Sequence, residues 1–121
     1  MIRPGIDHIA FTVPDLDEQV DRLTATFGMV VEGRTDQFAL ISDPASGLKL
    51  ELGRSADGEV HLRHLGFRAD DVDGAHAQLV ATGMTTSQAP HHRDFAGMYT
   101  SFLTQPGGIE VQLVRYDDAT R

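Results

Sequence analysis

The sequence predicts an α+β fold in which two βαβββ modules, residues 1–55 and 56–121, together form one domain. The first observation is an internal repeat: "HIAFTVPDLDEQVDRLTATFGM", which begins at His8, aligns with "HLGFRADDVDGAHAQLVATGM", which begins at His64, when one residue is deleted from the second copy. The second is the order of patterns, since each copy shows a strand-like alternation, then a helical period, then three short strand-like runs. The third is length, because 121 residues suffice for one compact domain or for two half-sized modules that share a core.

The first module opens with a strand and a helix. Alternating apolar residues, among them Ile9, Phe11 and Val13, predict the strand. Asp15 is the expected N-cap of the helix and Gly28 its expected stop. The apolar residues at helical spacing between these two ends are Leu16, Val20, Leu23 and Phe27. Runs rich in β-branched or aromatic residues then predict three strands, at 29–34, 37–42 and 47–53.

The second module repeats this order after the linker candidate "GRSADGEV". Asp71 or Asp70 is expected to cap a helix that ends at Gly83. Its apolar positions are Val72, Ala75, Leu79 and Val80. Strands are predicted at 84–87, 98–104 and 108–115, and the intervening segment 88–99, rich in His, Arg and aromatic residues, is expected to be irregular.

The last strands of the two modules also correspond, because "GLKLEL" in the first matches "GIEVQL" in the second. Under this pairing Glu51 corresponds to Gln112, and Lys49 corresponds to Glu110. The pairing therefore bears on which polar residue of the closing strand belongs to a working site.

Composition narrows the classes of partner. A formal net charge of -8 repels phosphate backbones and anionic lipid surfaces, so we expect neither nucleic acid nor membrane partners. No apolar run approaches the roughly 18 residues that span a bilayer, and the beginning of the sequence shows no secretory signal. The absence of cysteine excludes disulfides and thiolate chemistry and fits a cytoplasmic protein.

Strand alternation predicts which side chains face away from the helices. His8 and His64 fall on that face of the two first strands, and Glu51 on that face of the last strand of module one. The last strand of module two offers both Glu110 and Gln112. Two bent sheets that face each other are expected to gather these positions, and imidazoles with oxygen donors suit Fe, Mn, Co, Ni or Zn.

The segments "IDHIAFTVPDLDEQVDRLTATFGM", "HLGFRADDVDGAHAQLVATGM" and "YTSFLTQPGGIEVQLV" resemble the vicinal oxygen chelate superfamily, which includes glyoxalase I, methylmalonyl-CoA epimerase, extradiol dioxygenases, fosfomycin resistance enzymes and bleomycin-binding proteins. The resemblance implies a cup-shaped mixed sheet around a divalent metal, and commonly a homodimer whose cup forms within one chain or across two. It places the metal ligands at His8, Glu51, His64 and Gln112. The family pattern has Glu where this chain has Gln112, and a neutral amide can still bind metal through its oxygen.

The expected function is that of a divalent-metal-dependent lyase or isomerase of the glyoxalase or epimerase type, which stabilises the enolate of a small molecule with adjacent oxygens. Glu51 and Glu110 are the candidate catalytic bases. One alternative is an Fe(II) ring-cleaving dioxygenase that uses His8, His64 and Glu51. The other is a metal-free protein that binds a small molecule such as an antibiotic and confers resistance.

Several polar and aromatic residues are candidates for contacting the small-molecule substrate. They are Arg68, His91, His92, Arg93, Tyr99 and Phe102. Two further histidines are not assigned to the site. His61 is three residues before His64 on a strand and so points to the opposite face, and His76 is expected on the exposed side of its helix.

Overall fold

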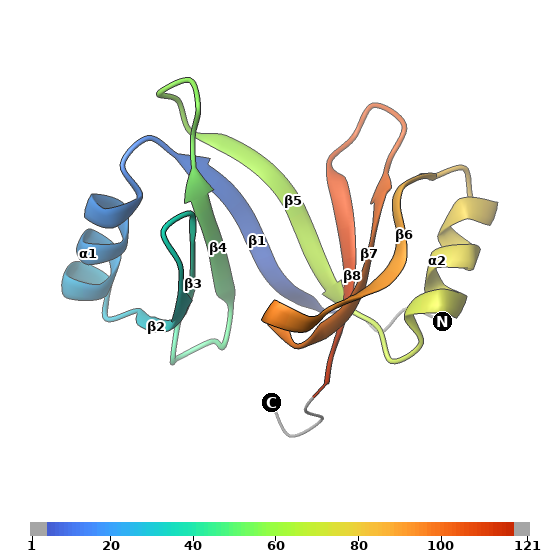
Figure 1. The fold of residues 1–121 in the computed structure, drawn as a ribbon, viewed down its shortest axis with the longest axis horizontal. Coiled ribbons are helices and arrows are strands. Elements are labelled where there is room, and N and C mark those ends of the chain that lie inside the picture. Colours follow the sequence, from blue (N-terminus) through green and yellow to red (C-terminus); the bar gives the residue numbers. More distant parts are fainter. Residues whose placement is uncertain (1–4, 118–121) are drawn as a thin grey trace. The chain divides into compact units, whose positions relative to one another are not determined.

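The computed structural model describes residues 5–117, apart from the side chain of Phe95. Within these residues the chain forms eight strands and two α-helices in the predicted order, βαβββ twice (Figure 1). It divides into two compact units: Asp7–Arg63, and a second that contains residues 5–6 and the residues from His64 onward. No helix of the described part is long and apolar enough to cross a membrane.

The first unit is a four-stranded sheet with one helix against it (Figure 1). Its elements are β1 (Ile6–Val13), whose first residue belongs to the second unit, α1 (Leu16–Phe27), β2 (Val30–Arg34), β3 (Phe38–Ser42) and β4 (Lys49–Arg54). The strands lie in the order β2-β3-β4-β1. β1 and β4 run parallel, and the other neighbours are antiparallel.

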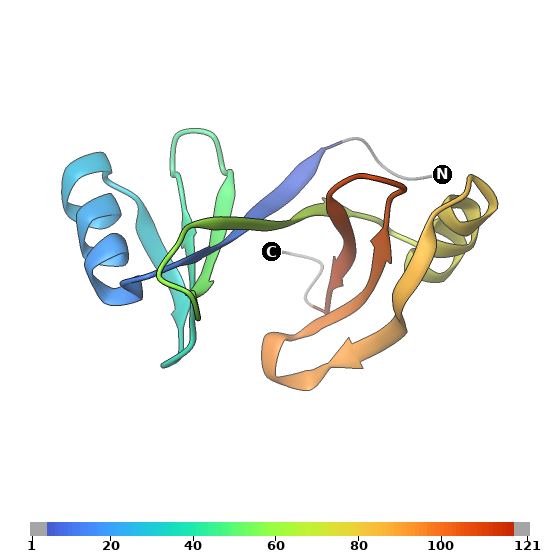
Figure 2. The same ribbon diagram turned by 90° about the horizontal axis from the view of Figure 1, so that it is seen from above.

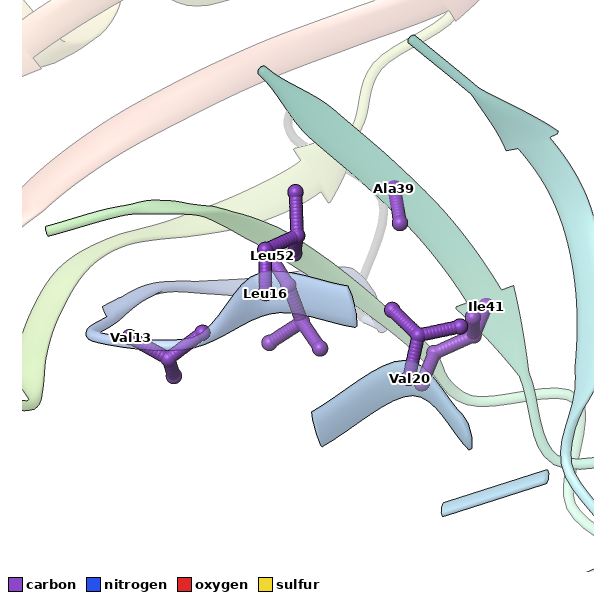
Figure 3. Close-up of a cluster of buried hydrophobic side chains, with 6 residues drawn as sticks. All are labelled: Val13, Leu16, Val20, Ala39, Ile41 and Leu52. Atoms are coloured by element: carbon purple, nitrogen blue, oxygen red, sulfur yellow. The ribbon is translucent and has the colours of Figure 1, made fainter. Parts of the chain in front are cut away.

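Helix α1 begins and ends as its sequence predicts. The Asp15 carboxylate accepts a hydrogen bond from the Glu18 backbone N–H, and Gly28 ends the helix in the left-handed region, where a side chain costs strain. Its buried stripe packs on β3 and β4, and Figure 3 shows the resulting core of Val13, Leu16, Val20, Ala39, Ile41 and Leu52. Phe27, the last apolar residue at this spacing, is 68% exposed.

The second unit has the same topology in the order β6-β7-β8-β5, with β5 and β8 parallel. Its elements are β5 (His61–Arg68), whose first three residues belong to the first unit, α2 (Val72–Ala81), β6 (Thr85–Arg93), the 3-10 turn η1 (Asp94–Ala96), β7 (Met98–Thr104) and β8 (Glu110–Tyr116). Asp71 is the N-cap of α2, and its carboxylate accepts from the Gly74 backbone N–H. The core between α2 and the sheet includes Val72, Ala75, Leu103, Val111 and Leu113, whereas Val80 is largely exposed.

The prediction of an irregular segment after the strand at 84–87 is wrong for residues 88–93. Strand β6 continues to Arg93 and pairs with β7 in a long hairpin, the orange ribbon of Figure 2. The register shifts between Thr86 and Gln88 and again between Gln88 and His91, which brackets Pro90. An edge strand with bulges tolerates proline because its outer N–H needs no partner in the sheet.

The expectation that His76 is exposed is also wrong. Its side chain is buried, and the two ring nitrogens form hydrogen bonds of 2.8 Å with the hydroxyls of Ser101 on β7 and Thr86 on β6. Ser101 lies on the core face, so the pair satisfies two polar groups that would otherwise be costly to bury. Burial lowers the pKa of His76, an effect that the nearby Asp73 carboxylate partly opposes.

Candidate functional site

The strand register confirms the correspondence between the last strands of the two modules. Glu51 lies two residues beyond the β4 residue that faces His8, and Gln112 lies two residues beyond the β8 residue that faces His64. The residues directly opposite the two histidines are Lys49 and Glu110. Each unit therefore carries a histidine and an oxygen-bearing side chain at equivalent places on the face away from its helix.

In the first unit, His8 is held from one side by a buried carboxylate. Its Nδ1 lies 2.8 Å from Asp7 Oδ2, and both side chains are almost fully buried. Because a carboxylate accepts, Nδ1 carries the hydrogen in this bond. This arrangement fixes the ring and directs Nε2 to the other side, as carboxylates do for histidines that bind metals.

The Nε2 atom of His8 lies 3.4 Å from Glu51 Oε2. When a histidine carries its hydrogen on Nδ1 alone, Nε2 presents a lone pair, here toward a carboxylate oxygen that also accepts. Two acceptors so placed attract a proton or a metal cation between them. The Glu51 side chain keeps about a third of its surface exposed, so a small cation can reach it.

In the second unit, Gln112 is buried to 2% exposure and its amide has a determined direction. The Thr100 hydroxyl donates to the Leu113 carbonyl at 2.6 Å, which commits its only hydrogen. It therefore accepts from Gln112 Nε2, which lies 2.9 Å away. With nitrogen on that side, where it also approaches the Met98 sulfur, the amide oxygen faces the other way.

His64 stands on the same face of the second unit and contacts an aromatic ring. It meets Phe102 edge to face, with ring centroids 5.3 Å apart and planes at 85°. Phe102 is the β7 neighbour of Gln112 in the strand register, so one buried ring borders both candidate ligands. The guanidinium of Arg93 covers that ring, with its central carbon 5.1 Å from the centroid.

Glu110 lies opposite His64 and is half-buried. The Ser87 hydroxyl of β6 donates to its Oε2 at 3.0 Å. Glu110 is thus a carboxylate beside the candidate ligands, with one oxygen engaged by a neutral group.

A model of the family described as "Glyoxalase/Bleomycin resistance protein/Dioxygenase superfamily" matches residues 5–113. The chain belongs to this superfamily. The predicted family and the predicted fold class of paired βαβββ modules are both confirmed. No curated protein matches the chain in sequence.

Solved members of the superfamily with the same fold include several methylmalonyl-CoA epimerases. The Mycobacterium tuberculosis enzyme is 23% identical with a TM-score of 0.76, over 96% of this chain and 90% of that one. A variant of the Streptomyces coelicolor enzyme, in complex with 2-nitronate-propionyl-CoA, is 25% identical with a TM-score of 0.72, over 93% and 97%. An epimerase in complex with methylmalonyl-CoA and NH4+ is 26% identical with a TM-score of 0.70, over 92% and 93%.

Three other residues predicted to contact the substrate, His91, Arg68 and Tyr99, form contacts with groups other than the candidate metal ligands. His91 Nδ1 bonds to the Ala89 carbonyl, and exposed Arg68 lies over the ring of Tyr116. The Tyr99 hydroxyl donates to Asp73 at the N-terminal turn of α2, on the helix side of the sheet, and this bond raises the pKa of Tyr99.

His92 is engaged by carboxylates at both ring nitrogens. Nε2 lies 2.8 Å from Asp117, and Nδ1 meets Asp94. These hydrogen bonds, Asp117 first and Asp94 second, raise the pKa of His92. Its ring therefore ties the end of β8 to the end of β6.

Sequence reasoning missed the two residues that orient the candidate ligands, Asp7 and Thr100. Asp7 precedes a candidate ligand, and an acidic neighbour of a histidine was a usable signal. Thr100 carried no such signal, because its role depends on the register of β7 against β8.

Proposed function

We propose that the protein is a divalent-metal-dependent isomerase of the epimerase type, which removes and returns a proton next to a carbonyl through an enolate. One observation carries the proposal. In each unit a buried histidine and an oxygen-bearing side chain occupy equivalent positions, and Asp7 and Thr100 turn the donor atoms of His8 and Gln112 outward. Similarity to methylmalonyl-CoA epimerases at 25 to 26% identity supports the same class of reaction.

The proposed metal ligands are His8 and Glu51 from the first unit and His64 and Gln112 from the second. Their chemistry fits a divalent ion, because two imidazoles, one carboxylate and one amide oxygen suit Fe, Mn, Co, Ni or Zn. Such a metal, when bound, supplies Lewis-acid stabilisation of negative charge on the substrate's neighbouring oxygens.

Glu110 is the proposed proton carrier. Glu51 already faces His8 Nε2 at 3.4 Å, so its carboxylate is the better ligand. Glu110 stands opposite His64, and Ser87 leaves one of its two oxygens without that hydroxyl donor. A carboxylate so placed can take a proton from carbon and return it on its own face of a planar enolate. Inversion also needs a proton donor on the opposite face, for which Glu51 is the other candidate base.

Methylmalonyl-CoA is the first substrate to test, since it is the ligand of a solved relative. The ring-cleaving dioxygenase and the metal-free binding protein stay predictions. Oxygen consumption with Fe(II) and a catechol would identify the former. Ligand binding that survives EDTA would identify the latter. The homodimer also stays a prediction, which sedimentation can check.

The decisive experiment is calorimetric titration of EDTA-treated protein with Mn, Co, Ni and Zn, followed by proton exchange at the α-carbon of methylmalonyl-CoA in deuterated water. We expect saturable binding of one metal per chain and exchange only in its presence. His8→Ala and His64→Ala should abolish both. His61→Ala is the matched control, because exposed His61 bonds to Asp57 and not to the candidate ligands. Absence of saturable metal binding, or equal binding by His8→Ala, would overturn the proposal.

A further inference from the structure

Arg93 differs from several other arginines of the chain in its surroundings. Arg22, Arg34 and Arg54 each reach a carboxylate of the first unit. Arg93 is half-buried, yet within residues 5–117 no carboxylate oxygen lies within 4.0 Å of its guanidinium. In a protein with eighteen acidic and ten basic residues, this arrangement calls for an explanation.

The polar partners of Arg93 in the described part of the chain are neutral. Its Nε donates to His91 Nε2 at 3.3 Å, and one terminal nitrogen donates to Gln88 Oε1 at 3.2 Å. His91 accepts this bond at Nε2 while its Nδ1 bonds to the Ala89 carbonyl, which is the pattern of the neutral tautomer. These contacts hold the guanidinium in place and leave its positive charge uncompensated.

The guanidinium is held on the ligand face of the second unit. It lies over one face of Phe102, whose ring meets His64 edge to face. A single aromatic ring thus separates the charge from a proposed metal ligand. Packing against Phe102 removes water from one side of the guanidinium, which strengthens its attraction for an anion on the open side.

We propose that Arg93 is the receptor for a carboxylate group of the substrate and so determines which substrates bind. This inference rests on the proposed function, because it assigns a second anchoring point to the same site. A guanidinium matches a carboxylate through two parallel N–H donors. A carboxylate fits better than a phosphate, because Arg93 is one charge without a second cation among its described contacts.

The test uses malonate as the probe and the Nε–H signal of Arg93 in nitrogen-15 NMR spectra of EDTA-treated protein. We expect a saturable shift with malonate and none with neutral malonamide at matched ionic strength. Arg93→Gln removes this reporter signal, so its malonate binding is followed by calorimetry, and it should be weaker at least about tenfold, the scale of a charge-assisted hydrogen bond. Arg115→Gln is the matched control, because Arg115 also lies over a ring, that of Tyr99 at 5.2 Å, but on the helix side.

A missing saturable shift, or equal weakening by Arg115→Gln, would overturn the inference, and phosphate binding as tight as malonate would overturn the carboxylate assignment. The metal titration reports separately, because Arg93→Gln should bind metal as the unaltered protein does. If the unaltered protein binds no metal but shows the malonate shift, the proposed function is wrong and the inference about Arg93 still stands. In the metal-loaded protein, Arg93→Gln should raise the KM for methylmalonyl-CoA about tenfold while kcat changes little.

Discussion

Thr100 determines which end of the Gln112 amide faces outward. Its hydroxyl gives its hydrogen to the Leu113 carbonyl and receives one from Gln112 Nε2, so the amide oxygen is the end that points away from Thr100. Thr100 is fully buried, and this arrangement leaves the hydroxyl no second hydrogen to offer. A neutral ligand can be as well oriented as a charged one when a neighbouring residue fixes its donor and acceptor ends.

Thr100→Val should therefore lower metal affinity about tenfold, the lower end of what loss of a ligand-orienting hydrogen bond costs. It should also lower the free energy of unfolding by about 1 to 3 kcal/mol, because Gln112 Nε2 loses its buried acceptor. Thr104→Val, at an exposed position of the same strand, is the control. Metal affinity is read by calorimetry and stability by urea titration. An unchanged affinity in Thr100→Val would show that Gln112 does not depend on this orientation.

Asp7→Asn should reduce metal affinity about 10- to 100-fold while keeping the side chain's shape. The amide no longer requires a hydrogen on His8 Nδ1, so the tautomer that exposes the Nε2 lone pair loses its support. Asp57→Asn makes the same chemical change beside the exposed His61 and should leave affinity unaltered. If both variants bind metal equally well, Asp7 does not position His8 for a metal.

Gln112→Glu should tighten metal binding by about tenfold, because a second carboxylate adds charge to the ligand set. It should also slow α-proton exchange, since the added charge offsets part of the metal's attraction for enolate oxygens. Gln37→Glu, on the turn between β2 and β3, adds the same charge elsewhere and is the control. Unaltered metal affinity in Gln112→Glu would remove Gln112 from the ligand set.

His92 should stabilise the fold more at low pH than at high pH. Its pKa is raised in the folded protein above 6.5, so its contribution is complete below that value and disappears as pH rises through the folded pKa. His92→Gln should therefore lower the Tm at pH 5.5 and have little effect at pH 9. Thermal unfolding at both values checks the sign. A larger loss at pH 9 would contradict it.

His76 should show the opposite dependence. Burial lowers its pKa in the folded protein below 6.5, so the folded state disfavours the proton and stability falls as pH drops below 6.5. Replacing His76 with Gln should flatten this acid-side decline, although the variant is less stable at pH 8 by about 1 to 3 kcal/mol through altered bonds to Ser101 and Thr86. Urea titrations between pH 5 and 8 measure both effects. If the free energy of unfolding of the variant still falls as steeply below pH 6.5, a group other than His76 causes the decline.

Much of the fold could be predicted because the repeat and the caps are local signals. Asp15, Gly28 and Asp71 stand where the pattern placed them, since capping depends on neighbours within four residues. The length of β6 could not be predicted, because Pro90 reads as an interruption until the strand is known to lie at an edge. The exposure of Phe27 could not be predicted either, because helical spacing gives the direction of a side chain but not the extent of the sheet beneath it.

Part of the candidate site could likewise be predicted from the sequence, and part could not. Alternation and the repeat predicted the faces of His8, His64 and Gln112, because both depend only on spacing along the chain. The hydrogen bonds by which Asp7 orients His8 and Thr100 orients Gln112 could not be predicted, since such bonds depend on side-chain rotamers and on strand register. His76 was misplaced for a related reason: only the fold shows that a serine faces it from the core side of β7.

The shared register also defines equivalent positions in the two units, between which a ligand and its orienting residue can be exchanged by design. Phe38 in β3 occupies the place that Thr100 holds in β7, because Phe38 pairs with Gly53, two residues after Glu51, and Thr100 pairs with Val114, two residues after Gln112. A duplicated fold can thus move a ligand type from one copy to the other by changing the ligand and its orienting neighbour together. Glu51→Gln together with Phe38→Thr would place an oriented amide in the first copy. Gln112→Glu would then supply the carboxylate ligand from the second copy.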